Sequence, residues 1–473
     1  MNDTRSDQNV PDLLAAFIKL LQSHRGIFSQ QRVYERAAAL ALAEVFSFGR
    51  HTVTQLLLAL GIEQADWSAW YRLYSHRRFD EAAAAAVMLQ AVLAELPEEE
   101  VFITGFDGFH VPRCSRKMPG TGWAKAGGTA PFKPGIARAQ RFVEGSWLTP
   151  LADGYSRAIP LRCLAAFPPK AVPSSEPARK EWEAALRYLD WLRTTLDGLA
   201  RRRQAILALA DGSFDTLGMW TELPERVSLL VRTRRDRCLY CLPEAYAGRG
   251  RPPLYGEKAP APYEWLHDRK GFQRYEVVVR GKRRSMRCRV EGPFLRETLP
   301  QQVLFLIVVG GGKRPTGARR KTYNPCFYLL SAVERDGRWQ LPVPLKQLLP
   351  WLWQRWELEV AHRELKSGLG LGEKQCWNRV AAVVSVQWSA WLYGVLLLAG
   401  YRTWGLLGGP QPPGRWRKQS RRWSLNTLWR GYRAALWGYH DFRASCLPSL
   451  DDWLKKQHFV AELHNAVTAS ARA

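Results

Sequence analysis

The sequence predicts an α/β fold in which a mixed sheet is interrupted by a β-rich insertion and accompanied by helical regions at both ends of the chain. Three observations lead to this prediction. Two apolar runs, at 101–106 and 205–210, have the length of buried strands, and each is followed by Asp-Gly. Between about 225 and 333, short β-type runs alternate with turns rich in Gly and Pro. Before residue 95 and after residue 348, apolar residues recur at helical spacing.

The first part of the chain, residues 1–95, is expected to form a small helical domain, because apolar residues recur there at intervals of three and four. Within it, the segment 51–57 leads through Gly61 to a second helix that carries Trp70 and Arg72. This spacing is typical of helix-turn-helix domains, which bind DNA through the second helix. Two helices joined by glycine also pack together in proteins that never bind DNA, so packing is at least as good an interpretation.

Residues 96–222 are expected to form the first part of a catalytic core. The pattern predicts strands at 101–106, 141–148, 158–167 and 205–210, with a long amphipathic helix between the third and the fourth strand. The first strand would end at Asp107 and the fourth at Asp211. Three strands, a helix and a further strand, with carboxylates at the ends of the first and fourth strands, is the order of a ribonuclease-H-like sheet.

The rest of the chain divides into an insertion, a second part of the core and a tail. The β-type runs place the insertion at 223–345, and helical spacing returns for the second part of the core at 346–405. A basic helical region rich in Trp is expected at 406–473, where cations and indoles alternate as in a nucleic-acid contact surface or along a solvated helix. The apolar stretch 380–400 is long enough to span a membrane, but Gln387 and the arginines on both sides favour a buried helix, and no membrane partner is expected.

Charge and cysteine content restrict the kind of partner and the compartment. The chain has 69 Lys and Arg against 43 Asp and Glu, a net charge of +26. Such a surface attracts nucleic acid, because neutralising phosphates releases condensed counterions. A ribosomal or histone-like protein would carry similar charge, but the 21 Trp residues better fit a large core or surfaces that stack on bases. Eight scattered Cys residues and a polar start without a secretory segment indicate reduced thiols in a cytoplasm.

One helical segment, 352–366, concentrates residues that suit phosphodiester chemistry. Arg355, Glu359, His362 and Lys366 are spaced four, three and four residues apart and so share one face of a helix. A carboxylate beside basic side chains suits a site that holds both metal ions and phosphate oxygens. Taken alone, the segment is better explained as a solvated charged face. The two Asp residues expected at strand ends shift the balance towards a site.

The spacing of Arg355, Glu359 and Lys366 reproduces Arg-x3-Glu-x6-Lys, and with it the chain resembles the insertion-sequence-four superfamily of DDE transposases. The signature of that family begins with a Tyr three residues before the Arg. Leu352 stands there in this sequence, so a role of that hydroxyl, such as a phosphate contact, has no equivalent group here. The resemblance spans about 40–400 and implies a ribonuclease-H-like domain with a β insertion between the second Asp and the Glu.

The resemblance also implies roles for five residues. The Asp-Gly sequences at Asp107 and Asp211 are similar to those of the family. In the family arrangement Asp107 would bridge two divalent ions, Asp211 would hold one and Glu359 the other, while Arg355 and Lys366 neutralise the scissile phosphate. Two ions roughly 3.5–4 Å apart activate the attacking oxygen and stabilise the leaving one. Hard oxygen ligands suit Mg²⁺ or Mn²⁺.

Further residues are expected to contact DNA. Arg249 and Arg251 belong to an Arg-Gly-Arg-Pro sequence that matches the core of a minor-groove hook. Such a sequence often arises by chance in basic loops, so a loop that contacts phosphates is the better explanation. Together with Arg355, His362 and Lys366, these two arginines make up the expected DNA-binding set.

These features predict a cut-and-paste DNA transposase, in which water frees a 3′ hydroxyl at the end of the element and that hydroxyl attacks target DNA. The resemblance implies the terminal inverted repeats and the target DNA as partners, a homodimer on DNA, and two Mg²⁺ or Mn²⁺ ions per active site. The enzyme would act in the cytoplasm, associated with the nucleoid. Two alternatives remain open: an inactive, domesticated DNA-binding descendant, which the intact Asp107, Asp211 and Glu359 disfavour, and a related nuclease that cuts without joining.

Overall fold

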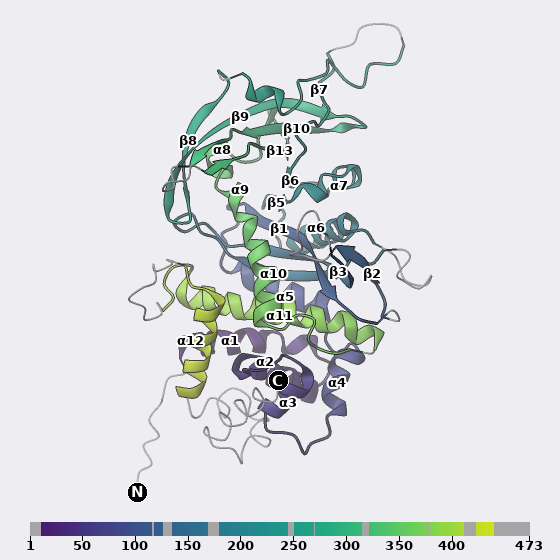
Figure 1. Cartoon of the computed structure of the whole chain (residues 1–473), viewed down its shortest axis with the longest axis vertical. Helices are drawn as coiled ribbons and strands as arrows, with labels where there is room; N and C mark the ends of the chain where they lie inside the picture. Colours follow the sequence, from purple (N-terminus) through teal and green to yellow (C-terminus); the bar gives the residue numbers. More distant parts are fainter. Residues whose placement is uncertain are drawn as a thin grey trace.

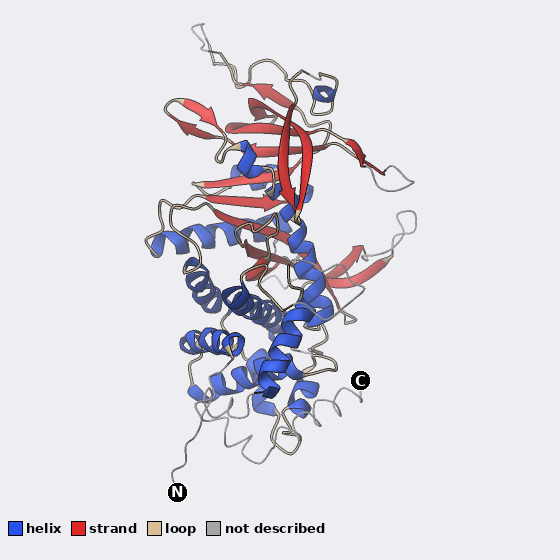
Figure 2. Ribbon diagram, turned by 90° about the vertical axis from the view of Figure 1, so that its left-hand side faces the viewer, coloured by secondary structure: helices blue, strands red, loops and turns tan. Residues whose placement is uncertain are grey.

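The structure, a computed structural model, is elongated, with helices gathered at one end, the insertion at the other and the core sheet between them (Figure 1). A view from the side shows the same division, with the strands stacked above the helical end (Figure 2). The structure describes residues 11–115, 118–125, 135–168, 179–244, 250–268, 270–314, 321–376, 378–410 and 422–438.

The core sheet is built from five strands: β1 (Phe102–Pro112), β3 (Ile136–Leu148), β4 (Ala158–Ala165), β5 (Ile206–Ala210) and β6 (Val227–Arg232). β3 is antiparallel to both β1 and β4, whereas β5 is parallel to both β1 and β6. The order β4-β3-β1-β5-β6, with three antiparallel strands followed by a helix and a strand parallel to the first, is ribonuclease-H-like. The predicted fold class is therefore confirmed. The short strand β2 (Thr121–Lys125) pairs with β3 on the outer part of the sheet.

The longer strands of the insertion continue this sheet instead of forming a separate one. Its strands are β13 (Cys326–Ser331), β10 (Leu299–Val309), β9 (Lys282–Arg296), β7 (Leu239–Cys241) and β8 (Gln273–Val279). β13 pairs with β6, and β10, β9 and β7 follow outwards, with β8 also beside β9. β6 falls inside the range 223–345 expected for the insertion, yet it belongs to the core sheet because it pairs in parallel with β5. Its other edge pairs with β13.

Short elements complete the chain. Two hairpins are formed by β11 (Gly312–Arg314) with β12 (Lys321–Tyr323), and by β14 (Val333–Arg335) with β15 (Arg338–Gln340). The short helices are η1 (Arg25–Ile27), η3 (Gly212–Phe214), α7 (Leu217–Thr221), η4 (Glu264–Leu266), α8 (Leu345–Leu348) and α9 (Trp351–Gln354).

Two helices, α6 (Glu181–Gly198) and α10 (Trp356–Gly368), cover opposite faces of the core sheet. A Cβ at Gly145 would lie 2.3 Å from the ring of Tyr188 on α6, and a Cβ at Gly105 would lie 3.0 Å from Leu358 on α10. Gly105 and Gly145 are one register step apart on paired strands, so their Cα–H bonds point to opposite faces. Glycine at both positions lets each helix approach the sheet closely.

A 26-residue helix, α11 (Arg379–Trp404), forms the centre of the helical end. Around it lie α1 (Asp12–Ser23), α2 (Gln31–Phe46), α3 (Val53–Ala59), α4 (Ser68–Ser75), α5 (Glu81–Leu93) and α12 (Leu425–Gly438). In the described part of the chain, α11 alone is long and apolar enough to cross a membrane. Within its most apolar 18 residues, 83% are buried inside the protein. Trp388 of α11 packs edge-on against Tyr74 and Phe79. The stretch expected to form a buried helix is thus the core of the helical end.

The predicted helix-turn-helix corresponds to α3 and α4, and α4 turns its indole inwards. Trp70 is only 3% exposed and belongs to the core together with Leu73. Tyr71 and Arg72 of the same helix remain exposed. Trp70 therefore stabilises the packing of α4 and is not available to contact bases.

A buried ion pair connects the N-terminal helices to the segment that follows α10. Glu44 of α2 and Lys374 are both buried, and Lys374 Nζ lies 2.6 Å from Glu44 Oε1. His51 contacts the other oxygen of the same carboxylate. Burial alone would raise the pKa of Glu44, but the charges of Lys374 and His51 lower it below the usual value. The N-terminal helices and the core consequently share one interior.

Candidate active site

The two Asp residues singled out from the sequence lie side by side on neighbouring parallel strands. In the β1–β5 pair, Gly105 is opposite Leu209, so Asp107 comes level with Asp211, directly after the end of β5. β1 does not end at Asp107, as the apolar pattern predicts, but continues to Pro112. The reason is β3, which pairs with β1 beyond the point where β5 stops.

Asp211 is held in place by local hydrogen bonds at the start of η3. Its Oδ1 accepts the Ser213 backbone N–H at 2.8 Å and the Ser213 hydroxyl at 2.5 Å. A side chain that caps the helix at its first residue satisfies backbone N–H groups that would otherwise lack a partner. The Asp-Gly-Ser sequence thus fixes the carboxylate of Asp211 at the edge of the sheet.

α10 brings Glu359 and Arg355 to the same edge. Arg355 joins α9 to α10 and keeps helical backbone angles, with φ −52° and ψ −32°. Its guanidinium lies between two carboxylates: Nη1 is 3.4 Å from Asp107 Oδ2, and Nη2 is 2.5 Å from Glu359 Oε1. Glu359 and Asp107 are therefore connected through a cation.

Negative charge accumulates around Asp107. Its pKa is raised to about 7, first by burial and then by the charge of Asp211, with Glu359 adding to the effect, whereas Arg355 and the Gly108 N–H oppose it. Among the residues that the structure describes, no three His, Cys, Asp or Glu side chains stand close enough together to hold a metal ion. The charges of Asp211 and Glu359 both act on Asp107, and Arg355 contacts Asp107 and Glu359. Hard oxygen ligands that repel one another in this way fit a divalent cation, which would neutralise them.

His362 and Lys366 share one face of α10 but differ in their surroundings. The His362 ring packs on Phe109, with 4.9 Å between centroids, and Nε2 lies 3.9 Å from Glu144 Oε2. Burial, followed by the charges of Lys366 and Arg355, lowers the pKa of His362 to about 3, so the ring is neutral. Expected to contact DNA, His362 instead lies inside the protein. Lys366 has an exposed side chain, although the protein around its ammonium group still lowers its pKa by burial.

Glu144 is a candidate site residue that the sequence pattern did not reveal. It lies on β3 directly opposite Asp107, so both side chains share the face of the sheet covered by α10. The carboxyl group is fully buried and accepts the Ser146 hydroxyl at 2.8 Å. Burial raises its pKa to about 8; the Ser146 hydrogen bond opposes this shift and Asp107 adds to it. A single Glu inside the apolar run 142–148 was the available signal, because an unpaired carboxylate is costly to bury.

An aromatic hollow of about 270 Å³ opens beside Asp211 and Arg355. Residues of β5, β6 and β13 and of the α9 region line it, and the aromatic ones are Tyr328, Trp351, Trp353 and Trp356. The Trp356 side chain is 48% exposed, which is high for so large an apolar group. A polymer that reaches Asp211 would therefore meet a carboxylate, a guanidinium and indole rings on the same side.

Of the two insertion arginines expected to contact DNA, the structure describes Arg251. Arg249 falls outside the described residues. Arg251 is exposed in the chain between β7 and η4. The structure thus places Asp211 level with Asp107, brings Asp107 and Glu359 to Arg355, and leaves Arg251 in the insertion.

Comparison with known proteins gives a family for the chain. A family model described as DDE superfamily endonuclease matches residues 27–288, more than half of the chain. No curated protein matches the chain significantly. Among solved structures, the chain is similar to a piggyBac transposase synaptic complex with hairpin DNA, determined by cryo-electron microscopy. The identity is 11%, the TM-score is 0.35, and the match covers 96% of this chain and 85% of that chain.

Proposed function

The chain belongs to the DDE superfamily of endonucleases, and from this premise we propose that it is a DNA transposase of the insertion-sequence-four-like group. It would cut DNA at the ends of an element and join those ends to a target. The observation that carries the proposal is that Arg355 contacts both Asp107 and Glu359, while Asp211 comes level with Asp107 and lines the same hollow as Arg355. Asp107 lies on β1 level with Asp211, which directly follows the parallel strand β5, and Arg355 links Glu359 to Asp107.

We assign Asp107, Asp211 and Glu359 as the residues that would hold two Mg²⁺ or Mn²⁺ ions. Carboxylate oxygens are the ligands these ions prefer. Burial raises the pKa of Asp107 most, and the charges of Asp211 and Glu359, which cations would neutralise, raise it further. When bound, the ions activate the attacking oxygen and stabilise the leaving one. Before the carboxylates can share an ion, the Arg355 side chain must leave Glu359, because its guanidinium now stands between two of them.

Arg355 and Lys366 supply positive charge for the scissile phosphate in this proposal. A guanidinium released from two carboxylates can bind two phosphate oxygens in parallel, which fixes the orientation of the phosphate. Lys366 lies eleven residues further along, three helical turns away on the same face, and adds a point charge. His362 supports α10 from inside the protein and makes no contact with DNA in this scheme.

The proposed partner is double-stranded DNA, namely the terminal inverted repeats of the element and its target. A net charge of +26 favours binding to phosphates of any sequence. We propose that α4, through the exposed Tyr71 and Arg72, and the insertion, through Arg251, contribute to recognition of the ends. A homodimer would hold two ends together, in the cytoplasm at the nucleoid.

The test uses the full-length chain and a plasmid that carries the DNA flanking its reading frame on both sides. Cutting at the ends and joining to a second plasmid are measured with Mg²⁺, with Mn²⁺ and with a chelator. Glu359→Gln is the matched variant, because the amide keeps the size of the side chain while removing one anionic ligand. We expect cutting and joining by the wild-type protein alone, and DNA binding by both proteins in a gel-shift assay.

Each alternative function gives a different result in this experiment. Cutting without joining identifies a nuclease, and binding without cutting identifies an inactive DNA-binding descendant. Equal cutting by the wild-type and Glu359→Gln proteins contradicts the three-carboxylate assignment.

A further inference from the structure

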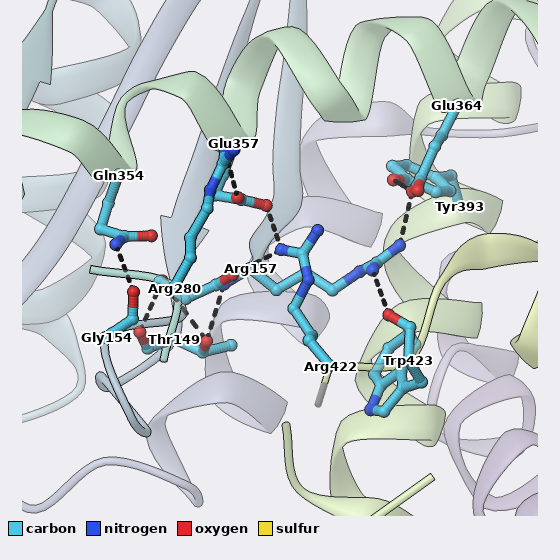
Figure 3. Close-up of polar contacts among 11 residues, drawn as sticks. Thr149, Gly154, Arg157, Arg280, Gln354, Glu357, Glu364, Tyr393, Arg422 and Trp423 are labelled. Atoms are coloured by element: carbon cyan, nitrogen blue, oxygen red, sulfur yellow. Dashed lines mark hydrogen bonds and ion pairs between the residues drawn. The ribbon is translucent and has the colours of Figure 1, made fainter. Parts of the chain in front are cut away.

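Two buried acidic residues, Glu357 and Glu364, lie on the side of α10 opposite Glu359. Glu357 is turned by about 200° from Glu359 around the helix, and Glu364 lies two turns beyond Glu357 on the same side. Their side chains are 3% and 12% exposed. Figure 3 shows both pointing from α10 towards a group of arginines that come from other elements.

Glu357 is paired with two arginines that are distant in the sequence. One oxygen contacts Arg422, which precedes α12, and the other lies 3.5 Å from Arg280 in the turn between β8 and β9. Arg422 also donates to the backbone carbonyl of Ser156 at 2.7 Å. Glu357 thus joins the insertion and the C-terminal region to the helix that carries Glu359.

Glu364 is likewise paired with residues from other elements, Arg157 and Tyr393. Its Oε2 accepts Arg157 Nη2 at 2.5 Å and the Tyr393 hydroxyl at 2.5 Å (Figure 3). Arg157 is itself buried, donates to the Trp423 carbonyl at 3.2 Å, and has its guanidinium 4.4 Å from the centre of the Trp423 ring. The turn between β3 and β4, helix α11 and the segment before α12 therefore meet at Glu364.

The tip of the β8–β9 hairpin is fixed to the core at the same place. The Arg280 N–H donates to the Gly154 carbonyl at 3.0 Å, and the Gln354 side chain donates to the same carbonyl at 2.9 Å. A Cβ on Gly154 would lie 2.4 Å from the Val278 carbonyl, so only glycine permits this approach. One carbonyl thus accepts a hydrogen bond from the insertion and another from the last residue of α9, which leads into α10.

Hydrogen bonds and ion pairs restrict the orientation of α10 more than apolar packing does, because they are directional. Apolar side chains would bury the same face of α10 but would tolerate rotation and sliding, because apolar contact is not directional. Glu357 and Glu364 lie two turns apart on one face of α10, and each is held by hydrogen bonds or ion pairs from other elements. Together these contacts define the rotation of the helix about its axis. That rotation determines where Arg355 and Glu359 point on the other side.

We propose that Arg157, Arg280 and Arg422 are positioning residues that hold α10 in the orientation that places Glu359 beside Asp107. The insertion tip and the C-terminal segment would then be required to assemble the site, in addition to any contact with DNA. The inference rests on the proposed function in one respect, the role of Glu359 as a metal ligand. Arg422 lies in a basic, Trp-rich segment that was considered as a nucleic-acid contact surface, and its burial favours this internal role.

The test compares three variants in the full-length protein. Arg422→Gln removes the charge but keeps a hydrogen-bonding group, and Arg422→Lys restores the charge. The control is Arg193→Gln on α6, across the sheet from α10. Arg193 is a buried arginine that donates to two backbone carbonyls and pairs with one carboxylate, so its loss perturbs the fold to a similar extent.

Two readouts that do not depend on turnover decide the question. Hydrogen exchange of the α10 amides and the Mn²⁺ concentration that half-saturates the protein are both measured for each variant. For Arg422→Gln we expect α10 to exchange about tenfold faster and half-saturation to need about tenfold more Mn²⁺, a change equivalent to ~1.4 kcal/mol. Arg422→Lys should recover most of both, and Arg193→Gln should leave both unchanged.

The proposal is overturned if Arg422→Gln leaves α10 exchange and Mn²⁺ binding at wild-type values, or if Arg193→Gln changes them equally. If Arg422→Gln does not fold, Arg280→Gln decides the matter, because Arg280 is 46% exposed and its loss leaves the interior intact. A wild-type chain that binds no Mn²⁺ would count against the proposed function alone. Exchange of the α10 amides would still determine whether these arginines position the helix.

Discussion

Replacing Glu144 by Gln should stabilise the protein, and the gain should increase with pH. Glu144 is fully buried opposite Asp107, and burial raises its pKa from the ordinary 4.5 to about 8. The folded protein therefore keeps a proton that the unfolded chain releases. Below pH 4.5 such a carboxyl group does not lower the free energy of unfolding. As the pH rises towards 8, it lowers the free energy of unfolding by an increasing amount.

The size of the effect follows from the two pKa values. Each pH unit between 4.5 and the pH of measurement costs the folded state about 1.4 kcal/mol. At pH 7 the cost reaches about 3 kcal/mol, and above pH 8 it levels off near 5 kcal/mol. Gln keeps the size and the hydrogen-bonding capacity of the side chain but has no proton to lose, so the variant avoids this cost.

The measurement is the free energy of unfolding in urea at pH 5, 6, 7 and 8, with a chelator present. Asp107, whose pKa is raised to about 7, also makes the free energy of unfolding depend on pH. Because both proteins contain Asp107, this effect largely cancels when they are compared. Glu99→Gln, at an exposed position, serves as the control and should show no pH-dependent gain. If the wild-type and Glu144→Gln proteins differ by the same amount at pH 5 and pH 8, Glu144 is not held protonated and the reasoning is refuted.

Three further single substitutions and one double substitution test the site and its support. Glu359→Gln should lower cleavage by several orders of magnitude while binding to end DNA persists, because one anionic ligand is lost and repulsion of phosphates decreases; a strand-cleavage assay with a parallel gel shift measures both. Lys366→Ala should lower cleavage by about one to two decades, since a charge-assisted contact contributes on the order of 1.5–3 kcal/mol; an unchanged rate would exclude Lys366 from the site. Lys374→Met should cost roughly 3–5 kcal/mol of stability, because it leaves Glu44 buried and poorly compensated. The added change Glu44→Leu should recover much of that loss in thermal unfolding.

The fold class could be predicted from the sequence because its signals are local. The apolar runs at 101–106 and 205–210 became β1 and β5, and the amphipathic stretch between them became α6. One inaccurate boundary near the site was the end of β1. That strand continues past Asp107 because β3 pairs with it, and the pairing partner lies 37 residues away in the sequence (144 − 107 = 37).

The candidate site could be predicted only in part. Helical spacing placed His362 on the same face as Glu359, but spacing says nothing about what packs on that face, and Phe109 covers the ring. In the same way, the basic pattern around Arg422 suggested an exposed surface, whereas Glu357 pairs with this arginine in the interior. Burial depends on neighbours that are distant in the chain, so local pattern cannot reveal it.

The sequence by itself determined the type and order of the elements, the positive charge, and the set of residues able to carry the chemistry. These depend on residue identity and on spacing within a strand or a helix. The tertiary structure alone decided which groups share an environment: Arg355 lies between Asp107 and Glu359, and Glu144 lies buried opposite Asp107. Arg355 and Asp107 are 248 residues apart. The pKa of a carboxyl group depends on burial and on charges a few ångströms away, and only the folded chain sets those distances.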